Sequence, residues 1–233
     1  MKPLFFLFVF TFFASLAYSQ GSQPVVLISG KVLNERNMEP LEAKVVWEYL
    51  SDGTEAGIAR TDPTTGEYKI ILPFGKNYGY MGLAEGFYSV TKNLDVTDLN
   101  EYKEIDEQNL FMAPVKESQV VRINNVFFKK KTAELLPESN QELCRFVEFL
   151  KINKKITIEI GGHTDNKGDT TELRMLSKDR AQAVTDYCIS KGIKADRIVV
   201  KGYGASQPIG FNKDEDGREM NRRIEFKVLN TGK

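Results

Sequence analysis

Hydrophobic and polar positions follow two different periods along the chain. From Val25 to about Pro114, short apolar runs such as "VVLISGKVLN", "AKVVWEYL" and "EYKIILP" alternate with turn clusters such as "SDGTEAG" and "TDPTTG". Several short strands at this spacing, with no long helical pattern between them, are typical of an all-β sandwich. We therefore predict a β-sandwich domain over residues 24–114, followed by a linker over residues 115–119.

From Val120 onward the pattern changes to an alternation of strands and helices. "VVRINNVFF", "KITIEIGG", "RIVVKGYG" and "RRIEFKVL" have the period of strands, whereas "NQELCRFVEFLKI" and the stretch from Glu172 to Lys191 repeat apolar residues at helical spacing. The order β-α-β-α-β-β favours a mixed sheet with helices on one face. The prediction is an α+β fold in which this second domain covers residues 120–230.

Two local signals mark helix ends in this second domain. Ser139, with Glu142 three residues later, predicts a capping box at the start of the first helix. Gly192 follows the second helix in the usual C-terminal position.

The second helix carries a charge in an unexpected place. At 100° per residue its apolar stripe contains Leu173, Leu176, Val184 and Tyr187, and Arg180 falls in the middle of that stripe. A charged side chain rarely faces a core unless something pairs with it. We therefore expect a partner for this guanidinium, either in the protein or in a ligand.

Asp165 is the candidate partner. It follows the strand "KITIEIGG" at the edge of the sheet where ligands bind in open α/β folds, and Gly161 and Gly162 leave the backbone open to close approach. A carboxylate and a guanidinium would suit a zwitterion, with an ammonium on Asp165 and a carboxylate in the fork of Arg180. The alternative is a salt bridge between Asp165 and Arg180 with no ligand.

The first residues have the composition of a targeting segment. Lys2 supplies a positive charge, Leu4 to Leu16 is almost wholly apolar, and Ala17-Tyr18-Ser19 has the small residues of a cleavage site. The apolar run is shorter than the ~20 residues that a membrane-spanning helix needs. We predict a secretory signal peptide over residues 1–19 and an exported mature protein.

The charge balance argues against one class of partner. The 32 Lys and Arg residues equal the 32 Asp and Glu residues in number, and binding to nucleic acid needs a clustered positive surface. The dense basic runs are Lys129-Lys130-Lys131 and Lys154-Lys155. Both are short, so we interpret them as solvated faces.

Two cysteines, Cys144 and Cys188, lie in the two predicted helices of the C-terminal half. Export permits a disulfide. The sequence leaves two outcomes open, which are two buried or half-buried thiols or a bridge between neighbouring helices.

Two further motifs resemble chemical sites. His163 is the only histidine, and because no metal-ligand cluster or nucleophile elbow accompanies it, we interpret it as a core residue. The segment "NKDEDG", residues 212–217, imitates the start of a calcium loop, but its twelfth position is Arg223 instead of the required glutamate. We interpret this segment as an exposed acidic loop and predict neither a metal nor a cofactor.

The C-terminal motifs, taken together, resemble those of a known family. "FF…AELLPES", "GGHTDNKGD", "LSKDRAQAV", "GYGASQPI" and "GREMNRRIEF" occur in this order between about Val120 and Leu229. They resemble the OmpA C-terminal-like domain, the peptidoglycan-associating module of bacterial envelope proteins. The resemblance implies that Asp165 and Arg180 bind diaminopimelate in the peptidoglycan stem peptide. The residues expected to support this site are Thr164, Gly162, Arg222 and Arg223.

Two features depart from the pattern of that family. Leu173 stands where the family often has asparagine, and Lys129, Lys130 and Lys131 stand where it often has acidic and aromatic residues. These departures change side chains around the expected site, so they bear on its affinity for peptidoglycan and on which stem peptide it prefers.

The N-terminal motifs resemble a second family more weakly. "ISGKV" and "TDPTTGEYKIILPFGKNY" are similar to the carboxypeptidase regulatory-like or transthyretin-like β-sandwich. In that family the module is a non-catalytic appendage, so the resemblance implies a spacer or a contact with another envelope protein.

The sequence therefore favours a non-enzymatic periplasmic protein that binds peptidoglycan non-covalently and is associated with the cell wall or outer membrane. One alternative is an envelope protein-interaction module in which the wall-binding site is degenerate and Asp165 and Arg180 are purely structural. Another is an envelope hydrolase that uses His163 and Asp165.

Overall fold

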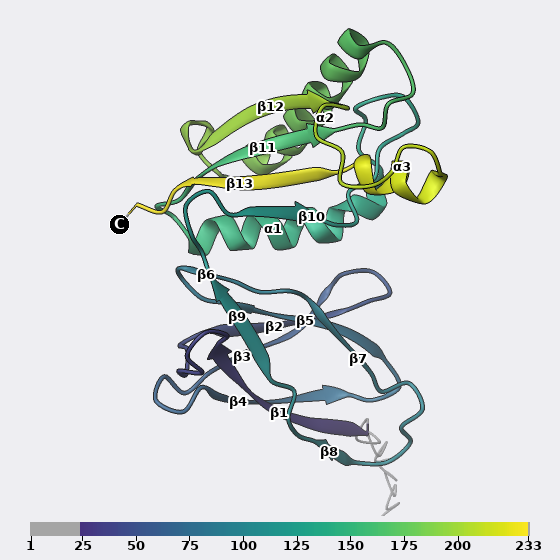
Figure 1. The fold of residues 1–233 in the computed structure, drawn as a ribbon. Coiled ribbons are helices and arrows are strands. Elements are labelled where there is room, and N and C mark those ends of the chain that lie inside the picture. The colour runs from purple at the N-terminus through teal and green to yellow at the C-terminus, as the bar shows by residue number, and fades with distance from the viewer. Residues whose placement is uncertain (1–23, 233) are drawn as a thin grey trace, which may run out of the picture.

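The computed structural model describes residues 24–232 (Figure 1). The signal peptide predicted over residues 1–19 lies outside the described residues. The strands are β1 (Val25–Asn34), β2 (Lys44–Tyr49), β3 (Glu55–Arg60), β4 (Glu67–Pro73), β5 (Asn77–Leu83), β6 (Phe87–Tyr88), β7 (Lys92–Asp95), β8 (Lys103–Ile105), β9 (Leu110–Pro114), β10 (Val120–Ile123), β11 (Thr157–His163), β12 (Ile198–Gly204) and β13 (Ile224–Asn230). The helices are α1 (Asn140–Ile152), α2 (Thr170–Ser190) and α3 (Glu215–Asn221), with 3-10 turns η1 (Pro137–Ser139) and η2 (Ala195–Arg197).

The N-terminal part consists of two sheets that share one apolar core. One sheet has the order β4-β1-β9-β6 with β8 added to β1, and the other has the order β3-β2-β5-β7. Alternate residues of β1 are buried, and the fully buried Trp47 of β2 stacks on Tyr80 of β5 with ring centroids 4.2 Å apart. Within residues 24–114 the structure describes strands and no helix, because period-2 patterns dominate there.

In the C-terminal part, α1 and α2 lie on one face of a four-stranded sheet with the order β10-β13-β11-β12 (Figure 1). Strands β11 and β12 are parallel, whereas β13 is antiparallel to β10 and β11. Ile158, Ile160 and Phe226 of the sheet belong to one buried cluster with Leu143 of α1 and Val184 of α2. The predicted α+β fold with a mixed sheet is confirmed.

Helix α3 is an element that the sequence pattern did not predict. The acidic segment of residues 212–217 was expected to be a loop, yet its residues 215–217 begin a short helix of seven residues. The side chain of Asp214 caps this helix by accepting a hydrogen bond from the backbone N–H of Gly217 at 2.6 Å. The helix is too short and too polar to show an apolar period in the sequence.

Both long helices begin differently from the prediction. The hydroxyl of Ser139 forms no capping hydrogen bond; it bonds the backbone N–H and carbonyl of Phe127 at 2.8 and 3.0 Å. The predicted capping box is therefore wrong. Helix α2 begins before the predicted Glu172, because the side chain of Asp169 accepts hydrogen bonds from the N–H groups of Thr171 and Glu172.

The two cysteines are free thiols. Cys188 is buried in the core of the C-terminal part, and burial raises the pKa of its thiol to about 12. Cys144 lies on the exposed side of α1, with its sulfur 3.1 Å from the hydroxyl of Tyr187. The structure has no bridge between them, but the outcome of two buried or half-buried thiols holds only for Cys188, because Cys144 is exposed.

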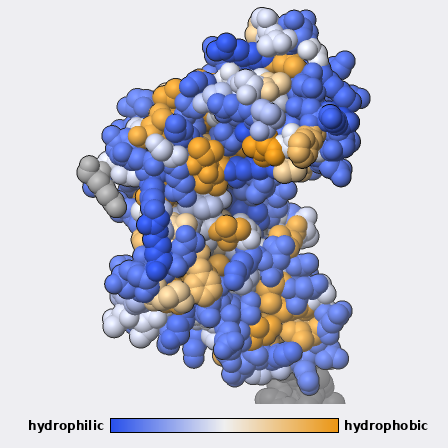
Figure 2. Space-filling model, viewed as in Figure 1, coloured by the Kyte–Doolittle hydropathy of each residue, from blue (hydrophilic) through white to orange (hydrophobic). Residues whose placement is uncertain are grey.

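The N-terminal and C-terminal parts contact each other directly. Tyr88 of β6 packs against the C-terminal core, with its ring centroid 5.7 Å from that of Phe149 and 6.0 Å from that of Phe226. The side-chain oxygen of Asn153 accepts a hydrogen bond from the N–H of Gly86 at 2.7 Å. Figure 2 shows a mostly hydrophilic surface that narrows to a waist between the two parts.

Residues 115–119, the predicted linker, are attached to the last strand. The N–H of Ser118 donates to the carbonyl of Val228 at 2.8 Å, and the N–H of Val228 donates to the carbonyl of Gln119 at 2.9 Å. The side chain of Val115 is buried in the C-terminal core. Among the described helices, none combines the length and apolarity that a membrane span requires.

Candidate functional site

Asp165 follows the C-terminal end of β11, a central strand of the C-terminal sheet. The strand ends at His163, and the chain turns there to enter α2. The residue is only 9% exposed. Its Oδ1 atom accepts the backbone N–H of Lys167 at 3.0 Å, so the loop itself orients the carboxylate.

The glycines below this loop allow α2 to lie directly on the sheet. A Cβ atom at Gly162 would lie 2.0 Å from the carbonyl oxygen of Ser177 in α2. At Gly202 of β12, a Cβ atom would lie 2.6 Å from the carbonyl oxygen of Arg174. The close approach predicted at Gly162 is therefore made by this helix.

Arg180 lies at the edge of the buried face of α2, not in its middle. The buried residues of the helix are Ser177, Ala181, Val184, Thr185 and Cys188. Of the stripe seen in the sequence, Leu173, Leu176 and Tyr187 are only partly buried. The contact face is rotated from that stripe because small residues at 177 and 181 let the helix approach the strands, whereas larger side chains would hold it away.

Two contacts hold the side chain of Arg180. Its Nε–H donates a hydrogen bond to the carbonyl of Thr132 at 2.9 Å. Its guanidinium carbon lies 5.0 Å from the centre of the Phe128 ring, within the range of cation–π attraction. Among residues 24–232, no carboxylate forms an ion pair with Arg180.

Arg222 joins two carboxylates beside this guanidinium. Its Nη1 donates to Oδ2 of Asp165 at 2.7 Å, and its Nη2 donates to Oε1 of Glu215 at 2.7 Å. Glu215 also pairs with Arg218 at 2.6 Å. The salt bridge that the sequence suggested between Asp165 and Arg180 is thus replaced by one between Asp165 and Arg222.

These charges act on one another. Burial lowers the pKa of Arg180, the nearby Arg222 lowers it further, and Asp165 opposes both effects. Hydrogen bonds from Arg218 and Arg222 lower the pKa of Glu215 to about 2, so this carboxylate is ionised at neutral pH. Arg180 is consequently a partly desolvated cation that lacks a paired carboxylate in the described chain.

Two of the predicted supporting residues hold the surrounding loops. The Nε of Arg223 lies 2.9 Å from Oε2 of Glu225, and its Nη1 donates to the carbonyl of Gln207 at 3.2 Å. The backbone N–H of Thr164 donates to the carbonyl of Gly204 at 2.9 Å. Arg223 and Thr164 are both buried.

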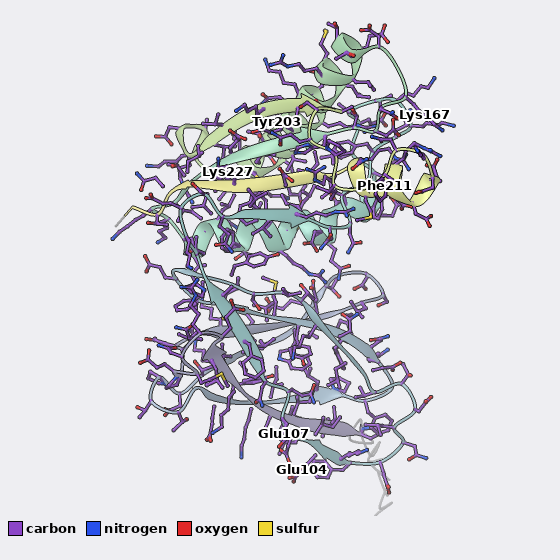
Figure 3. The ribbon with its side chains drawn as sticks, viewed as in Figure 1. Glu104, Glu107, Lys167, Tyr203, Phe211 and Lys227 are labelled. Carbon is purple, nitrogen blue, oxygen red and sulfur yellow. The ribbon has the colours of Figure 1, made fainter. Side chains whose placement is uncertain are left out.

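His163 is enclosed by protein. Its side chain has no exposed surface, and its Nε2 lies 3.0 Å from Oε1 of Glu225. Its ring stacks on that of Tyr203 (labelled in Figure 3), with centroids 4.8 Å apart. The interpretation of His163 as a core residue is confirmed.

The polar groups of the calcium-like segment are used within the protein. Asp214 caps α3, and the carbonyl of Asn212 accepts a hydrogen bond from Nη1 of Arg218 at 2.9 Å. In the part of the chain that the structure describes, no group of three or more His, Cys, Asp or Glu side chains is arranged to hold a metal ion.

Sequence reasoning missed three residues of the site, namely Phe128, Thr132 and Glu215. Thr132 lies 48 residues from Arg180 along the chain, so no local pattern connects them. Glu215 lies seven residues before Arg222, a spacing that places two residues on one face of a helix. That signal would have indicated the contact only if α3 had been predicted.

Comparison with known proteins assigns part of the chain to a family. Residues 127–222 match the OmpA family. These residues form an OmpA family domain. The OmpA domain contains Asp165, Arg180 and Arg222, so the group of charges described above lies within it.

Curated relatives match the same half of the chain. It is 34% identical over 117 residues to the outer membrane porin F of Pseudomonas fluorescens, covering 50% of this chain and 35% of that protein. It is 35% identical over 103 residues to the peptidoglycan-binding protein ArfA of Mycobacterium bovis, covering 44% of this chain and 32% of that protein. The chain thus spans about a third of the length of these relatives.

Solved structures similar to this chain also align with about half of it. The peptidoglycan-associated lipoprotein of Burkholderia pseudomallei is 23% identical, with a TM-score of 0.42, and the match covers 44% of this chain and 87% of that one. An outer membrane protein of Borrelia burgdorferi is 28% identical, with a TM-score of 0.39, and the match covers 48% of this chain and 96% of that one.

Proposed function

We propose that this chain is a non-enzymatic protein of the cell envelope that binds peptidoglycan non-covalently through its OmpA domain. The similarity to a relative named as peptidoglycan-binding supports this proposal. The observation that carries it is the state of Arg180, a half-buried cation with no carboxylate paired to it in the described chain. Burying a charge is costly unless a partner compensates, and a ligand carboxylate would supply that partner.

The arrangement suits a zwitterionic ligand such as the diaminopimelate of a stem peptide. Only Nε of Arg180 donates a hydrogen bond in the described chain, so both outer nitrogens are available as a planar fork for a carboxylate. A carboxylate has about four acceptor positions, and that of Asp165 uses one for Lys167 and one for Arg222. The remaining positions would accept an ammonium.

The geometry gives no support to hydrolysis. The hydrolase hypothesis needed His163 as a base, and the side chain of this histidine is enclosed against Tyr203 and Glu225. Binding without catalysis needs only the two poles, Asp165 and Arg180. We infer that the protein acts after export, in the periplasm, in association with the cell wall or outer membrane.

We further propose that residues 24–114 form an accessory β-sandwich domain of the carboxypeptidase regulatory-like type. Its two sheets around Trp47 support this assignment. The domain would act as a spacer or contact another envelope protein. If the domain has no part in wall binding, substitutions at its exposed positions should leave peptidoglycan binding by the mature chain unchanged.

The wall-binding proposal is tested by co-sedimentation with purified peptidoglycan. Asp165→Asn keeps the size of the side chain but removes the charge that faces an ammonium, and Arg180→Lys keeps the charge but loses the planar fork. A hydrogen bond to a charged group is worth about 1.5–3 kcal/mol. Each variant should therefore bind roughly ten- to a hundredfold more weakly.

Matched controls and melting curves separate binding from stability. Asp98→Asn and Arg60→Lys make the same changes at exposed positions of the N-terminal part and should bind as the wild type does. The rival hypothesis is an interaction module with a degenerate wall site. It predicts that folded Asp165→Asn and Arg180→Lys variants co-sediment like the wild type, and that result would reject the ligand site.

A further inference from the structure

The loop that contains Lys129, Lys130 and Lys131 is part of the wall of the candidate site. Arg180 contacts it at both ends, through the ring of Phe128 and the carbonyl of Thr132. The loop is also internally ordered. Phe128 forms a bridge with Leu135 across it, the N–H of Lys129 donates to the carbonyl of Glu134 at 2.9 Å, and the N–H of Thr132 donates to the carbonyl of Lys129 at 3.0 Å.

The lysines of this loop are exposed, and two of them are uncompensated. Lys129 pairs with Glu134 at 3.1 Å, whereas Lys130 and Lys131 form no ion pair within residues 24–232. Lys131 directly precedes Thr132, whose carbonyl accepts the hydrogen bond from Arg180. The Cα atoms of Lys131 and Thr132 are therefore about 3.8 Å apart. The loop that carries these two lysines therefore borders the site.

The carboxylates already present do not neutralise the cations of the site. Among residues 24–232, Arg218 and Arg222 pair with two carboxylates, those of Asp165 and Glu215, and Arg180 pairs with none. A zwitterionic ligand adds no net charge, so it leaves this excess unchanged. The positive potential of this excess charge then favours a ligand that carries a further anionic group.

We propose that Lys130 and Lys131 form a second subsite, which selects stem peptides carrying a free carboxylate beyond the diaminopimelate carboxylate held by Arg180. This inference rests on the proposed function and adds to it the class of peptide that the site prefers. The C-terminal carboxylate of the residue that follows diaminopimelate would be the group that these lysines bind. A peptide in which that carboxylate is an amide loses the attraction but keeps both groups that Asp165 and Arg180 bind.

Two synthetic stem peptides provide the test. Both contain unmodified diaminopimelate followed by D-alanine, and they differ only in whether the terminal carboxylate is free or amidated. Because exposed ion pairs contribute modestly and are screened by salt, the free peptide should bind the mature chain roughly three- to tenfold more tightly at low salt. Calorimetric titration at low and at high salt measures this ratio.

Substitution of the lysines assigns the preference to the loop. In the double variant Lys130→Gln/Lys131→Gln the ratio between the two peptides should fall to about one, while the affinity for the amidated peptide stays as in the wild type. The control is Lys154→Gln/Lys155→Gln, which removes the same charge from exposed positions before β11, at the opposite end of that strand from Asp165. It should keep the wild-type ratio.

The outcomes distinguish this inference from the proposed function. If neither peptide binds the wild type, the diaminopimelate site itself is rejected, and the second subsite with it. If both peptides bind equally well, or if the lysine double variant keeps the preference, the proposed function stands and the lysine subsite is rejected. A preference that falls equally in both double variants would show only a general effect of net charge, which also rejects it.

Discussion

Gly162 is the residue on which the position of α2 depends most directly. The carbonyl of Ser177 lies where the side chain of any other residue would begin. This contact places Arg180, one turn further along the same helix, at the edge of the sheet. The geometry of the candidate site therefore depends on a residue that has no functional group.

Gly162→Ala should destabilise the protein by about 1–3 kcal/mol or more, because an added Cβ would meet backbone 2.0 Å away and the helix must move. Gly161→Ala is the matched control. Its Cβ would meet the ring of Tyr203 at 3.0 Å, and a side chain can turn aside more readily than backbone. Urea denaturation of both variants measures the difference, and equal losses would show that α2 does not rest on Gly162.

At the scale of elements, α2 carries one pole of the site and its N-terminal cap fixes where it begins. Asp169 accepts hydrogen bonds from the N–H groups of Thr171 and Glu172 at 2.9 and 3.1 Å. These N–H groups have no partner within the helix. The same loop carries Asp165, so the cap also fixes the length of chain between β11 and the helix.

Asp169→Ala should lower the free energy of unfolding by about 1 kcal/mol, the usual value of such a cap. Asp179→Ala is the control, since it replaces an exposed aspartate in the interior of the same helix. Alanine has the higher helix propensity there, so this variant should be neutral or slightly more stable. Chemical denaturation that shows equal effects for both would exclude a capping role for Asp169.

At the scale of the whole molecule, the N-terminal part contributes an aromatic side chain to the core of the OmpA domain. Tyr88 contacts Phe149 and Phe226, and an ion pair between Glu48 of β2 and Arg145 of α1 crosses the same junction. Both groups of that pair are largely buried, so removing Arg145 would leave Glu48 uncompensated, whereas Arg145 also pairs with Glu142 at 3.2 Å. The aromatic contacts and the ion pair thereby link the stability of one core to that of the other.

Tyr88→Ala should destabilise the OmpA domain by roughly 2 kcal/mol, less than the cost of removing a fully buried aromatic ring because Tyr88 is only partly buried. Differential scanning calorimetry should show the transition of the C-terminal part moving to lower temperature and separating from that of the N-terminal part. Tyr102→Ala, at a tyrosine that is 57% exposed, is the control. An unchanged calorimetric profile in Tyr88→Ala would mean that the two cores unfold independently.

The sequence by itself determined the strands of the C-terminal part, the two long helices and the two charged residues at the candidate site. In the N-terminal part it indicated β1, β2 and β4, but it placed the start of β3 in a turn cluster. Period-2 and helical patterns are local properties, and Asp165 and Arg180 could be identified from the end of a strand and from a charge within an apolar stripe. Tertiary structure decided the partners of those residues. Asp165 pairs with Arg222, which is 57 residues away, and Arg180 contacts Thr132, which is 48 residues away. It also decided which face of α2 is buried, because the close approach at Gly162 depends on a helix and a strand meeting. Contacts between distant segments leave no periodic signal in the chain, since they arise only when the elements pack together.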